Sequence, residues 1–277
     1  WFQGFRLLPD CCRPFPDSFS PHRPQFNHTI MSFQFEQGEV LLVNKPYSWT
    51  SFDVVGKLRI TIRQRTGLRK IKIGHAGTLD PLATGLLILC TGKFTRRIDE
   101  FQGLEKEYTG TFRLGATTPS FDLETEIDKT FPMEGWDTPP GSTVPPAWEA
   151  AIREAAKHFT GTLEQVPPQF SAIKIDGRRA YKSARKDISV EIKAREVNIS
   201  AFEITRIAKP DVDFRVICSK GTYIRALARD FGQRLGCGAH LTALCRTRIG
   251  SFYLRDAYEL SDLQNLIPDS RGEHKPE

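Results

Sequence analysis

The sequence predicts an α+β protein with a mixed, largely antiparallel sheet flanked by helices. Several short segments alternate apolar and polar residues, which is typical of half-buried strands. Three longer segments instead repeat apolar residues three and four positions apart, which is typical of amphipathic helices. The two kinds of segment do not alternate with the regular spacing of βαβ units, so a purely parallel sheet is disfavoured.

The regular pattern begins near residue 39. Residues 40–43 are a short apolar run that ends at an Asn-Lys-Pro turn, which predicts a strand. Thr50 and Ser51 then offer a helix N-cap. The residues expected on the buried face of this helix are Val54, Val55, Leu58 and Ile62. Most of its basic residues fall outside that face and can therefore contact a ligand.

The middle of the chain predicts three further strands and a second helix. Residues 71–73 and 86–90 are expected to be short strands on either side of a glycine-rich loop. Residues 108–114 alternate in polarity and predict a half-buried strand. Proline and glycine mark residues 132–146 as a loop, and residues 148–159 then have the apolar spacing of an amphipathic helix.

The last predicted elements are two strands and a helix. Residues 197–207 and 212–218 have strand character, and the second of these segments alternates strictly in polarity. Residues 222–235 predict a helix that buries its apolar face and carries Arg225 and Arg229 one turn apart.

Positive charge is segregated along the sequence. The 277 residues include 39 Lys and Arg against 33 Asp and Glu, a net charge of +6. Residues 54–79 contain seven basic residues and no acid, and a second basic cluster covers residues 174–186. An acidic stretch lies between them. One such cluster alone would fit a solvated surface equally well, but two clusters favour binding to a nucleic acid.

Several classes of protein are excluded. The longest apolar run, residues 86–90, is far shorter than the roughly 20 residues that cross a bilayer. Six cysteines at irregular spacing do not form a disulfide scaffold, and Cys90 and Cys218 lie in apolar runs, as expected for reduced thiols of a cytoplasmic protein. Residues 1–30 are rich in proline and lack periodicity. We predict a disordered leader or a remnant of upstream sequence there, followed by one folded domain over residues 31–277.

The glycine-rich loop at residues 74–85 is the densest candidate for chemistry. Asp80 is the only acid between Asp53 and Asp99, and it follows the long basic stretch. A carboxylate near arginines is suited to act as a nucleophile or a base. An ordinary turn hydrogen bond would explain an aspartate in such a loop as well. The residues alone leave both interpretations open and slightly favour the turn.

Other chemistries have weaker support. Cys237, His240 and Cys245 are close in sequence, but a zinc site needs about four ligands and no CxxC pair exists, so no metal site is expected. No GxSxG, HExxH or Walker motif is found. Residues 92–95 resemble the end of a phosphate-binding loop, but Leu87 stands where the first glycine of that motif belongs, so nucleoside triphosphate binding is not expected.

Five ordered segments carry a family resemblance. GHAGTLDPLATGLL at residues 74–87 resembles the catalytic-aspartate motif of the TruB family of tRNA pseudouridine-55 synthases. The chain departs from the family at Ser48 and Asp187, where glycine is usual, and we expect neither residue to touch the carboxylate of the motif. The other four segments, in family order, are NKPYSWTSFDVV (44–55), KEYTGTFRLGATT (106–118), QVPPQFSAIKIDGRRAY (165–181) and CSKGTYIRALARDFGQRLGCGAHLTALCRTRIGSF (218–252).

The resemblance implies a pseudouridine-synthase-like catalytic domain that isomerises uridine 55 in the T-loop of tRNA, without a cofactor. It assigns the essential carboxylate to Asp80 and implies that Arg225 pairs with it. Tyr108 would stack on the flipped base, although a lone tyrosine there would more often be a core residue. Tyr223 and Leu244 would line the pocket. His75 would enter the space that the uridine vacates, although an isolated histidine in such a loop is more often structural.

The RNA is expected to be held through its phosphates by both basic clusters. Only 23 residues follow Leu254, where longer relatives carry an RNA-binding PUA domain, so we expect the catalytic domain to bind the T-arm stem-loop by itself. The candidates for phosphate contacts are Arg63, Arg65, Arg69, Lys174, Arg178 and Arg179.

We expect a monomer without an obligate protein partner. Three alternatives stay open: a dyskerin-like subunit that takes its target from a guide RNA, a non-catalytic module that binds or folds tRNA, and an N-glycosidase. The presence of Asp80, Tyr108 and Arg225 favours an enzyme over a binding module. An N-glycosidase would release free uracil, which distinguishes it from an isomerase.

Overall fold

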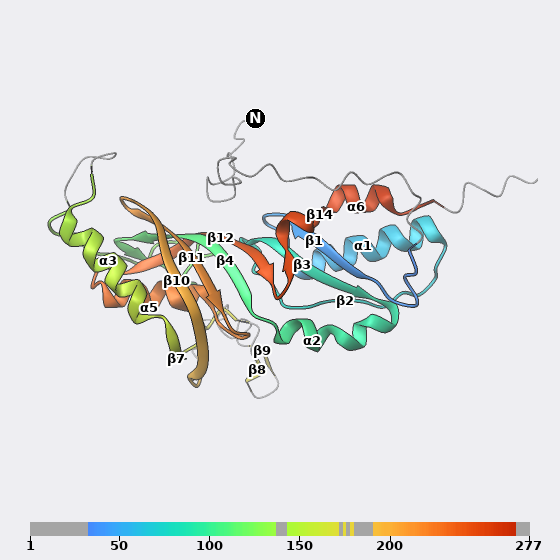
Figure 1. Cartoon of the computed structure of the whole chain (residues 1–277), viewed down its shortest axis with the longest axis horizontal. Helices are drawn as coiled ribbons and strands as arrows, with labels where there is room; N and C mark the ends of the chain where they lie inside the picture. The colour runs from blue at the N-terminus through green and yellow to red at the C-terminus, as the bar shows by residue number, and fades with distance from the viewer. Residues whose placement is uncertain (1–32, 137–142, 172–173, 176–177, 180–190, 270–277) are drawn as a thin grey trace, which may run out of the picture. The chain divides into compact units, whose positions relative to one another are not determined.

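The computed structural model describes residues 33–136, 143–171 and 191–269, together with the backbone of residues 174–175 and 178–179 (Figure 1). The chain forms two compact units. The first contains the chain up to Gly103 and again from Cys245 onward, and the second contains Leu104–Leu244. The predicted leader at residues 1–30 lies outside the described residues.

The first unit has a mixed sheet centred on β3. Strand β1 runs antiparallel to β3 and parallel to β14, β2 runs antiparallel to β3, and the last residues of β12 run parallel to β3. The short β13 pairs with the end of β12. The elements of this unit are β1 (Val40–Lys45), α1 (Ser51–Thr66), β2 (Ile73–His75), β3 (Thr84–Thr91), the 3-10 helix η2 (Gly92–Arg97), α2 (Ile98–Gly103), the end of β12 (Ala239–Ile249), β13 (Phe252–Tyr253), η3 (Leu254–Asp256), β14 (Tyr258–Glu259) and α6 (Leu260–Leu266).

Helix α1 is built as the sequence predicts. Thr50 caps its N-terminus in a capping box with Asp53, and Gly67 ends it in the left-handed conformation with φ of 72°. The predicted apolar face is buried in a core shared with β1, β3 and α6. Helix α6 lies beside α1 (Figure 1), and Arg65 of α1 donates to the backbone carbonyls of Asn265 and Ile267 at 3.2 and 2.8 Å.

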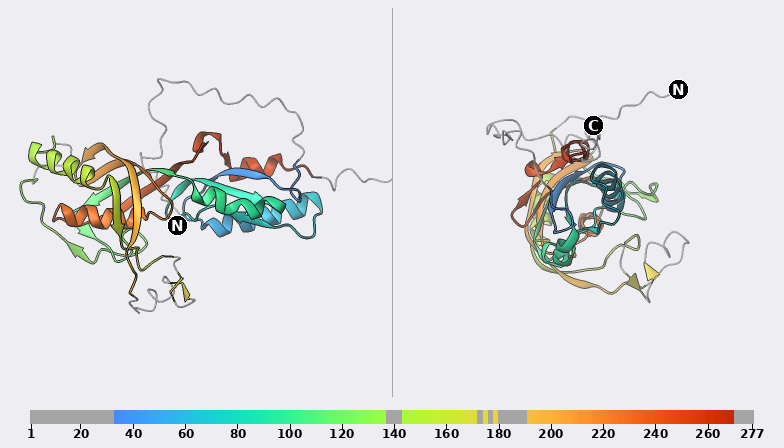
Figure 2. Two further views of the ribbon diagram at one scale, coloured as in Figure 1. Left: turned by 60° about the horizontal axis from the view of Figure 1, so that its bottom comes forward. Right: turned by 90° about the vertical axis from the view of Figure 1, so that its right-hand side faces the viewer.

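The second unit has an antiparallel sheet with helices packed on it. Strand β4 pairs with β11, β11 with β10, and β10 with β7. Helix α3 packs on β10 and beside α5, and Figures 1 and 2 show the two helices side by side. The elements of this unit are β4 (Lys106–Leu114), β5 (Ala116–Thr117), β6 (Lys129–Thr130), α3 (Pro146–His158), β7 (Gly161–Gln165), β8 (Lys174–Ile175), β9 (Arg178–Arg179), β10 (Arg195–Ala208), β11 (Asp211–Cys218), α5 (Ile224–Arg234) and the start of β12.

An aromatic cluster forms the core of the second unit. Phe112 of β4 stacks on Phe214 of β11 with ring centroids 4.1 Å apart, and Phe202 meets both rings edge-on. Phe231 is tilted against Phe112 and edge-on to Phe202. These side chains are 7% exposed or less, so each contributes on the order of 2 kcal/mol by burial. Gly110 lies in the same strand, where an added Cβ would come within 2.5 Å of the carbonyl of Ala243.

The predicted fold class is confirmed, and most predicted elements lie where the sequence places them. Strand β2 begins at Ile73 and not at Ile71, because its partner β3 ends at Thr91, opposite Ile73. The start of α5 is likewise Ile224 and not Thr222. Strand β12 was not predicted, since it is buried along both faces and therefore lacks the expected alternation. Cys90 and Cys218 are buried and form no disulfide within the described residues, and burial raises the pKa of Cys90 to about 11.

Candidate active site

The Asp80 loop connects β2 to β3 in the first unit and is tied down by its backbone. The N–H of Leu79 donates to Ser51 Oγ at 2.9 Å, and that hydroxyl lies 3.3 Å from the Leu79 carbonyl. The N–H of Ala83 donates to the Asp80 carbonyl at 3.1 Å, which closes a turn around Pro81. Asp80 itself is half-buried. The first turn of α1 therefore sets the position of the residue that precedes Asp80.

A fully buried lysine supports the other side of this loop. Lys45, the last residue of β1, has no exposed surface and lies close enough to Asp80 for the two charges to attract. Burial lowers the pKa of Lys45 to about 8, the Asp80 carboxylate opposes that shift, and Arg246 adds to it. Lys45 Nζ donates to the backbone carbonyls of Pro46 at 2.8 Å, Trp49 at 2.6 Å and Pro81 at 3.2 Å.

A buried arginine from β12 reaches the same loop. Arg246 is 1% exposed and donates from Nε to the Leu86 carbonyl at 2.8 Å and from Nη2 to the Gly77 carbonyl at 3.1 Å. Gly77 has φ of 94°, and Gly85 has φ of 101°. A Cβ at Gly85 would lie 2.4 Å from the Arg246 backbone. The absence of a side chain at Gly85 thus allows β12 to approach the loop closely enough for the Arg246 guanidinium to contact it.

His75 lies at the end of β2, at the start of the same loop. Burial lowers the pKa of His75, and the positive charge of Arg246 lowers it further, so the ring is neutral at pH 7. Its Nδ1 atom is buried and has no hydrogen-bond partner within the described part of the chain. Lys45, Ser51 and Arg246 were not among the predicted site residues, whereas His75 and Asp80 were.

Substitution of Lys45 by methionine should destabilise the first unit. The change removes three hydrogen bonds and leaves the Trp49 carbonyl without its lysine donor, so we expect a loss of about 1–3 kcal/mol in the free energy of unfolding. Denaturant titration of both proteins near pH 7 measures this difference. Lys57→Met, on the exposed face of α1, is the control and should stay within about 0.5 kcal/mol of the wild type.

The difference in stability between the wild type and Lys45→Met should depend on pH. Between pH 8 and 10.5, folded Lys45 has lost its proton while the unfolded lysine still holds one, so the stability of the wild type relative to Lys45→Met should rise with pH. Below pH 8 the difference should be constant. A flat difference across the whole range would show that Lys45 titrates normally.

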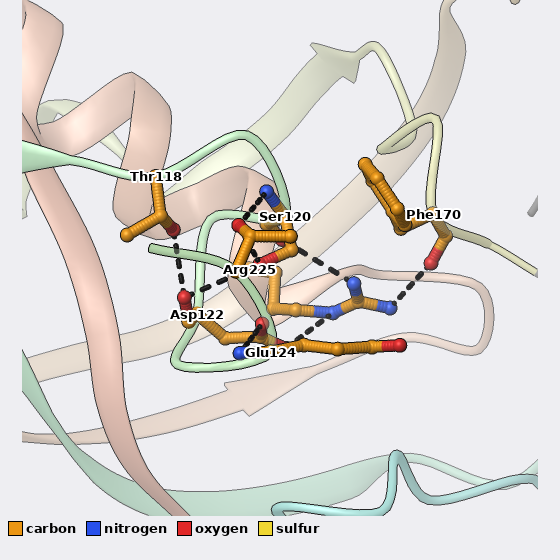
Figure 3. A network of polar contacts seen from close by, with 7 residues as sticks. Thr118, Ser120, Asp122, Glu124, Phe170 and Arg225 are labelled. Atoms are coloured by element: carbon orange, nitrogen blue, oxygen red, sulfur yellow. Dashed lines mark hydrogen bonds and ion pairs between the residues drawn. The ribbon is translucent and has the colours of Figure 1, made fainter. Parts of the chain in front are cut away.

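Arg225 is the centre of a buried polar network in the second unit (Figure 3). It lies in the first turn of α5 and is 3% exposed. Its guanidinium donates to the carbonyl of Ser120 at 3.3 Å and to the carbonyl of Phe170 at 2.9 Å. Its Nε atom lies 3.5 Å from Oδ2 of Asp122, which is also buried. Asp122, which was not predicted, therefore contributes to the position of this arginine.

The loop around Asp122 is held by its own hydrogen bonds. The N–H of Glu124 donates to Asp122 Oδ1 at 2.9 Å. The hydroxyls of Thr118 and Ser120 donate to the Asp122 carbonyl at 2.7 and 3.2 Å (Figure 3). The loop from β5 toward β6 thus presents its acid to Arg225 in a fixed orientation.

Tyr223 precedes α5 and is clamped through its backbone. The buried side chain of Gln165 accepts a hydrogen bond from the Tyr223 N–H at 2.8 Å and donates one to the Tyr223 carbonyl at 3.2 Å. The guanidinium of Arg195 lies over the Tyr223 ring, 4.6 Å from its centroid, and donates to the Gly221 carbonyl. Neither Gln165 nor Arg195 was predicted, because only the folded chain brings β7 and β10 to this residue.

The remaining predicted pocket residues belong to strands of the second unit. Tyr108 lies in β4 and is 9% exposed, and Leu244 lies in β12 and is 8% exposed. Tyr108 shares a face of β4 with Phe112, as the alternation predicts. Tyr108, Tyr223, Arg225 and Leu244 are residues of the second unit, and His75 and Asp80 are residues of the first.

The predicted phosphate contacts fall into three groups. Arg63 and Arg69 are exposed, and Arg65 is half-buried because it donates to the carbonyls at the end of α6. The third group lies in β8 and β9, where only the backbone is described; its members are Lys174, Arg178 and Arg179.

The described residues contain neither a cluster of metal ligands nor a membrane-spanning helix. In that part of the chain, no group of three or more His, Cys, Asp or Glu side chains lies close enough together to hold a metal ion. His240, one of the residues considered for zinc, has its Nδ1 atom 3.0 Å from the Ala116 carbonyl. No helix in the described part is both long and apolar enough to cross a membrane.

The sequence and structure are similar to known proteins over most of the chain. Residues 63–224 match the TruB family pseudouridylate synthase N-terminal domain, and residues 225–275 match the tRNA pseudouridylate synthase B C-terminal domain. The chain is 55% identical over 229 residues to tRNA pseudouridine synthase B of Flavobacterium johnsoniae, covering 82% of this chain and 95% of that one. It is 54% identical over 233 residues to the protein of the same name from Phocaeicola vulgatus, covering 84% and 94%.

Two solved structures are similar at lower identity. A chain of a Cbf5–Nop10–Gar1 complex superposes with a TM-score of 0.59 at 29% identity, and a chain of an H/ACA RNP bound to a substrate RNA containing 2'-deoxyuridine superposes with 0.57 at 27%. The matches cover 83% of this chain but only 54% and 53% of those chains, so this chain spans about half their length. The two domain matches and the identity above one half together show that this chain belongs to the TruB family of pseudouridylate synthases.

Proposed function

We propose that this protein converts uridine 55 in the T-loop of tRNA to pseudouridine, with Asp80 as its essential carboxylate. The observation that carries the proposal is the identity of 54–55% to proteins named tRNA pseudouridine synthase B, over 94–95% of their length. Asp80 lies in the segment that resembles the catalytic-aspartate motif of that family, in a loop held on two sides by buried cations.

The reaction rearranges one nucleotide. The N1–C1′ glycosidic bond breaks, the uracil turns, and a C5–C1′ bond forms, while C5 gives up its proton and N1 takes one up. Every heavy atom is retained, so the overall change is neither an oxidation nor a reduction. The uridine must first leave its stack, at a cost of a few kcal/mol that contacts in the pocket offset. Asp80 supplies the anionic oxygen for these steps, and Lys45 and Arg246 hold its loop in place.

The other pocket residues bind and orient the base. Tyr108 stacks on the flipped uracil, and Tyr223 and Leu244 line the space around it. Arg225 pairs with Asp80, and His75 enters the space that the nucleotide vacates. The backbone clamp from Gln165 supports the role of Tyr223, because a residue that touches substrate must be held in one position.

The phosphates of the RNA are bound by exposed cations. Arg63 and Arg69 fit this role best, because they are exposed and have no acidic partner in the described part of the chain. Arg65 also stabilises the end of α6, so its substitution would confuse a binding test. The predicted phosphate contacts in β8 and β9 stay predictions; they are Lys174, Arg178 and Arg179.

A guide-RNA-dependent subunit is the second candidate, and the sequence identities disfavour it. The solved chains from a Cbf5–Nop10–Gar1 complex and from an H/ACA RNP are 29% and 27% identical to this chain, whereas the tRNA pseudouridine synthase B proteins are 54–55% identical. A module that only binds tRNA is disfavoured because Asp80, Tyr108 and Arg225 are all present. We further propose that the enzyme works in the cytoplasm as a monomer without an obligate protein partner.

An isolated T-arm stem-loop should be sufficient as a substrate. RNA loops are recognised by their shape and by splayed bases, so the arm contains most of the information that the enzyme needs. We expect kcat/KM for the stem-loop to be within about tenfold of that for whole tRNA, equivalent to roughly 1.4 kcal/mol. Mass spectrometry of digested RNA measures the conversion, and the absence of free uracil distinguishes isomerisation from glycosidase activity.

The control substrate is the same stem-loop with cytidine at the target position, which should not react. An inert stem-loop together with a reactive whole tRNA would contradict the proposed T-arm recognition. Failure of both RNAs would contradict the proposed function itself.

A further inference from the structure

A concave site lies in the first unit, lined by residues outside the Asp80 loop. The cavity has a volume of about 240 Å³ and is lined by Glu36, residues 70–72 and residues of η2. Four of the lining side chains are basic, and we call this group the cationic pocket: Lys70, Lys72, Lys93 and Arg96.

The backbone fixes the three segments that form the cationic pocket. The N–H of Gly92 donates to the Lys72 carbonyl at 2.9 Å, and the N–H of Lys93 donates to the Glu36 carbonyl at 3.3 Å. Gly92 has φ of 51°, and a Cβ there would lie 2.2 Å from the Glu36 carbonyl oxygen. Thr95 Oγ1 donates to the Gly92 carbonyl at 2.8 Å. Backbone hydrogen bonds and the tight turn at Gly92 therefore fix the position of the segments that line the pocket.

Positive charge in the cationic pocket is not neutralised. Lys70, Lys72 and Arg96 are exposed and have no acidic partner in the part of the chain that the structure describes. Lys93 Nζ donates to Gln37 Oε1 at 2.8 Å, and that amide is neutral. One carboxylate, Glu36, stands against the four cations of the lining. By contrast, the neighbouring Arg97 is paired with Glu100 at 2.9 Å. A concave surface with excess positive charge attracts anions.

The size and composition of the pocket select the kind of anion. No aromatic side chain is among the lining residues, so a base would find no aromatic ring to stack on there. The volume is also below the roughly 300–1,000 Å³ of pockets that enclose small-molecule ligands. A nucleotide is therefore a poor fit, whereas a phosphate group of an RNA backbone needs only cations and backbone shape.

We propose that the cationic pocket binds a backbone phosphate of the tRNA substrate, an inference that rests on the proposed function. Phosphate contacts position an RNA without reading its sequence. The pocket thus adds a positioning contact for the RNA chain, and residues 92–95 take part in it through a phosphodiester and not through a nucleoside triphosphate.

Removal of charge from the pocket tests this proposal. The variant combines Lys70→Gln, Lys72→Gln and Arg96→Gln, and the matched control combines Lys129→Gln, Lys193→Gln and Arg234→Gln. All six residues are exposed, and both proteins lose three positive charges. Equilibrium binding to a whole tRNA transcript is measured over a series of salt concentrations. Thermal melting verifies that both variants fold like the wild type.

We expect the pocket variant to bind tRNA about tenfold more weakly than the control, with the slope of log Kd against log salt reduced by about one. Saturated turnover should be unchanged in both proteins. Equal losses in the two variants would overturn the proposal, because only net charge would then matter. Titration with inorganic phosphate provides a further test. Tight phosphate binding that disappears in the pocket variant while tRNA affinity is retained would identify a free anion as the ligand.

These outcomes are separable from a failure of the proposed function. A wild-type protein that makes no pseudouridine would contradict the function, whatever the pocket variant does. A wild-type protein that converts tRNA normally, with a pocket variant that binds tRNA as the control does, would overturn the pocket alone.

Discussion

Asp80→Asn should abolish pseudouridine formation while leaving the protein folded and able to bind tRNA. Asparagine has nearly the same shape as aspartate but cannot act as a nucleophile or as a base. Hydrogen bonds to the backbone of the loop, from Lys45 and Arg246 and to Ser51, are retained in the variant. Removal of an essential catalytic group typically lowers kcat by at least about 10⁴-fold, and we expect a loss of that size.

Single-turnover conversion of a T-arm stem-loop measures the effect, and equilibrium binding of the same RNA is measured in parallel. Asp99→Asn is the matched control, because Asp99 is an exposed aspartate of the same unit, in the first turn of α2. It should convert RNA at the wild-type rate. Activity of Asp80→Asn within about tenfold of the wild type would place the essential carboxylate elsewhere.

Elements whose pattern is local were predictable from the sequence. Helix α1 carries its cap at Thr50, its apolar face and its terminating Gly67 within one segment, so no distant contact is needed to define it. Strands β4 and β11 alternate in polarity because each has one face on the aromatic core. The fold class follows from such segments, and the structure confirms it.

The supports of the site were not predictable, because they depend on distant partners. Lys45 precedes a proline turn and resembles a surface lysine in sequence, yet it is fully buried. One of the carbonyls that accept its hydrogen bonds belongs to Pro81, 36 residues away. Arg246 lies in a strand that lacks alternation. Arg65, a predicted phosphate contact, also donates to carbonyls about 200 residues later in the chain, which its local sequence does not reveal.

The family motif predicts Asp80 as the essential carboxylate. The side chains that hold its loop in place are buried cations that donate to backbone carbonyls. A sequence pattern does not record which carbonyls a cation will meet. Buried charges must be paired or hydrogen-bonded, so the most informative residues for the site are those whose burial contradicts their polarity. Lys45, Arg225 and Arg246 all meet this description.

Arg225→Met should strongly destabilise the second unit. Methionine fills much of the space but cannot pair with Asp122, and it leaves the carbonyls of Ser120 and Phe170 without this donor. Breaking a buried pair by removing one partner costs about 3–5 kcal/mol, because the remaining charge stays buried. We therefore expect a loss of that size in the free energy of unfolding, together with loss of isomerase activity.

A matched control and a double-mutant cycle separate the buried pair from a general effect on α5. Arg229 lies one turn further along the helix and is paired with Asp230 at 2.7 Å, but its side chain is 19% exposed. Arg229→Met should therefore cost less, about 1 kcal/mol, because water reaches this pair and screens its charges. Asp122→Leu combined with Arg225→Met removes both charges, so the double variant should be more stable than the sum of the two single losses predicts. Denaturant unfolding of all the variants measures these differences. Additive losses, or a cost for Arg225→Met no larger than that for Arg229→Met, would show that the Arg225–Asp122 contact does not stabilise this unit.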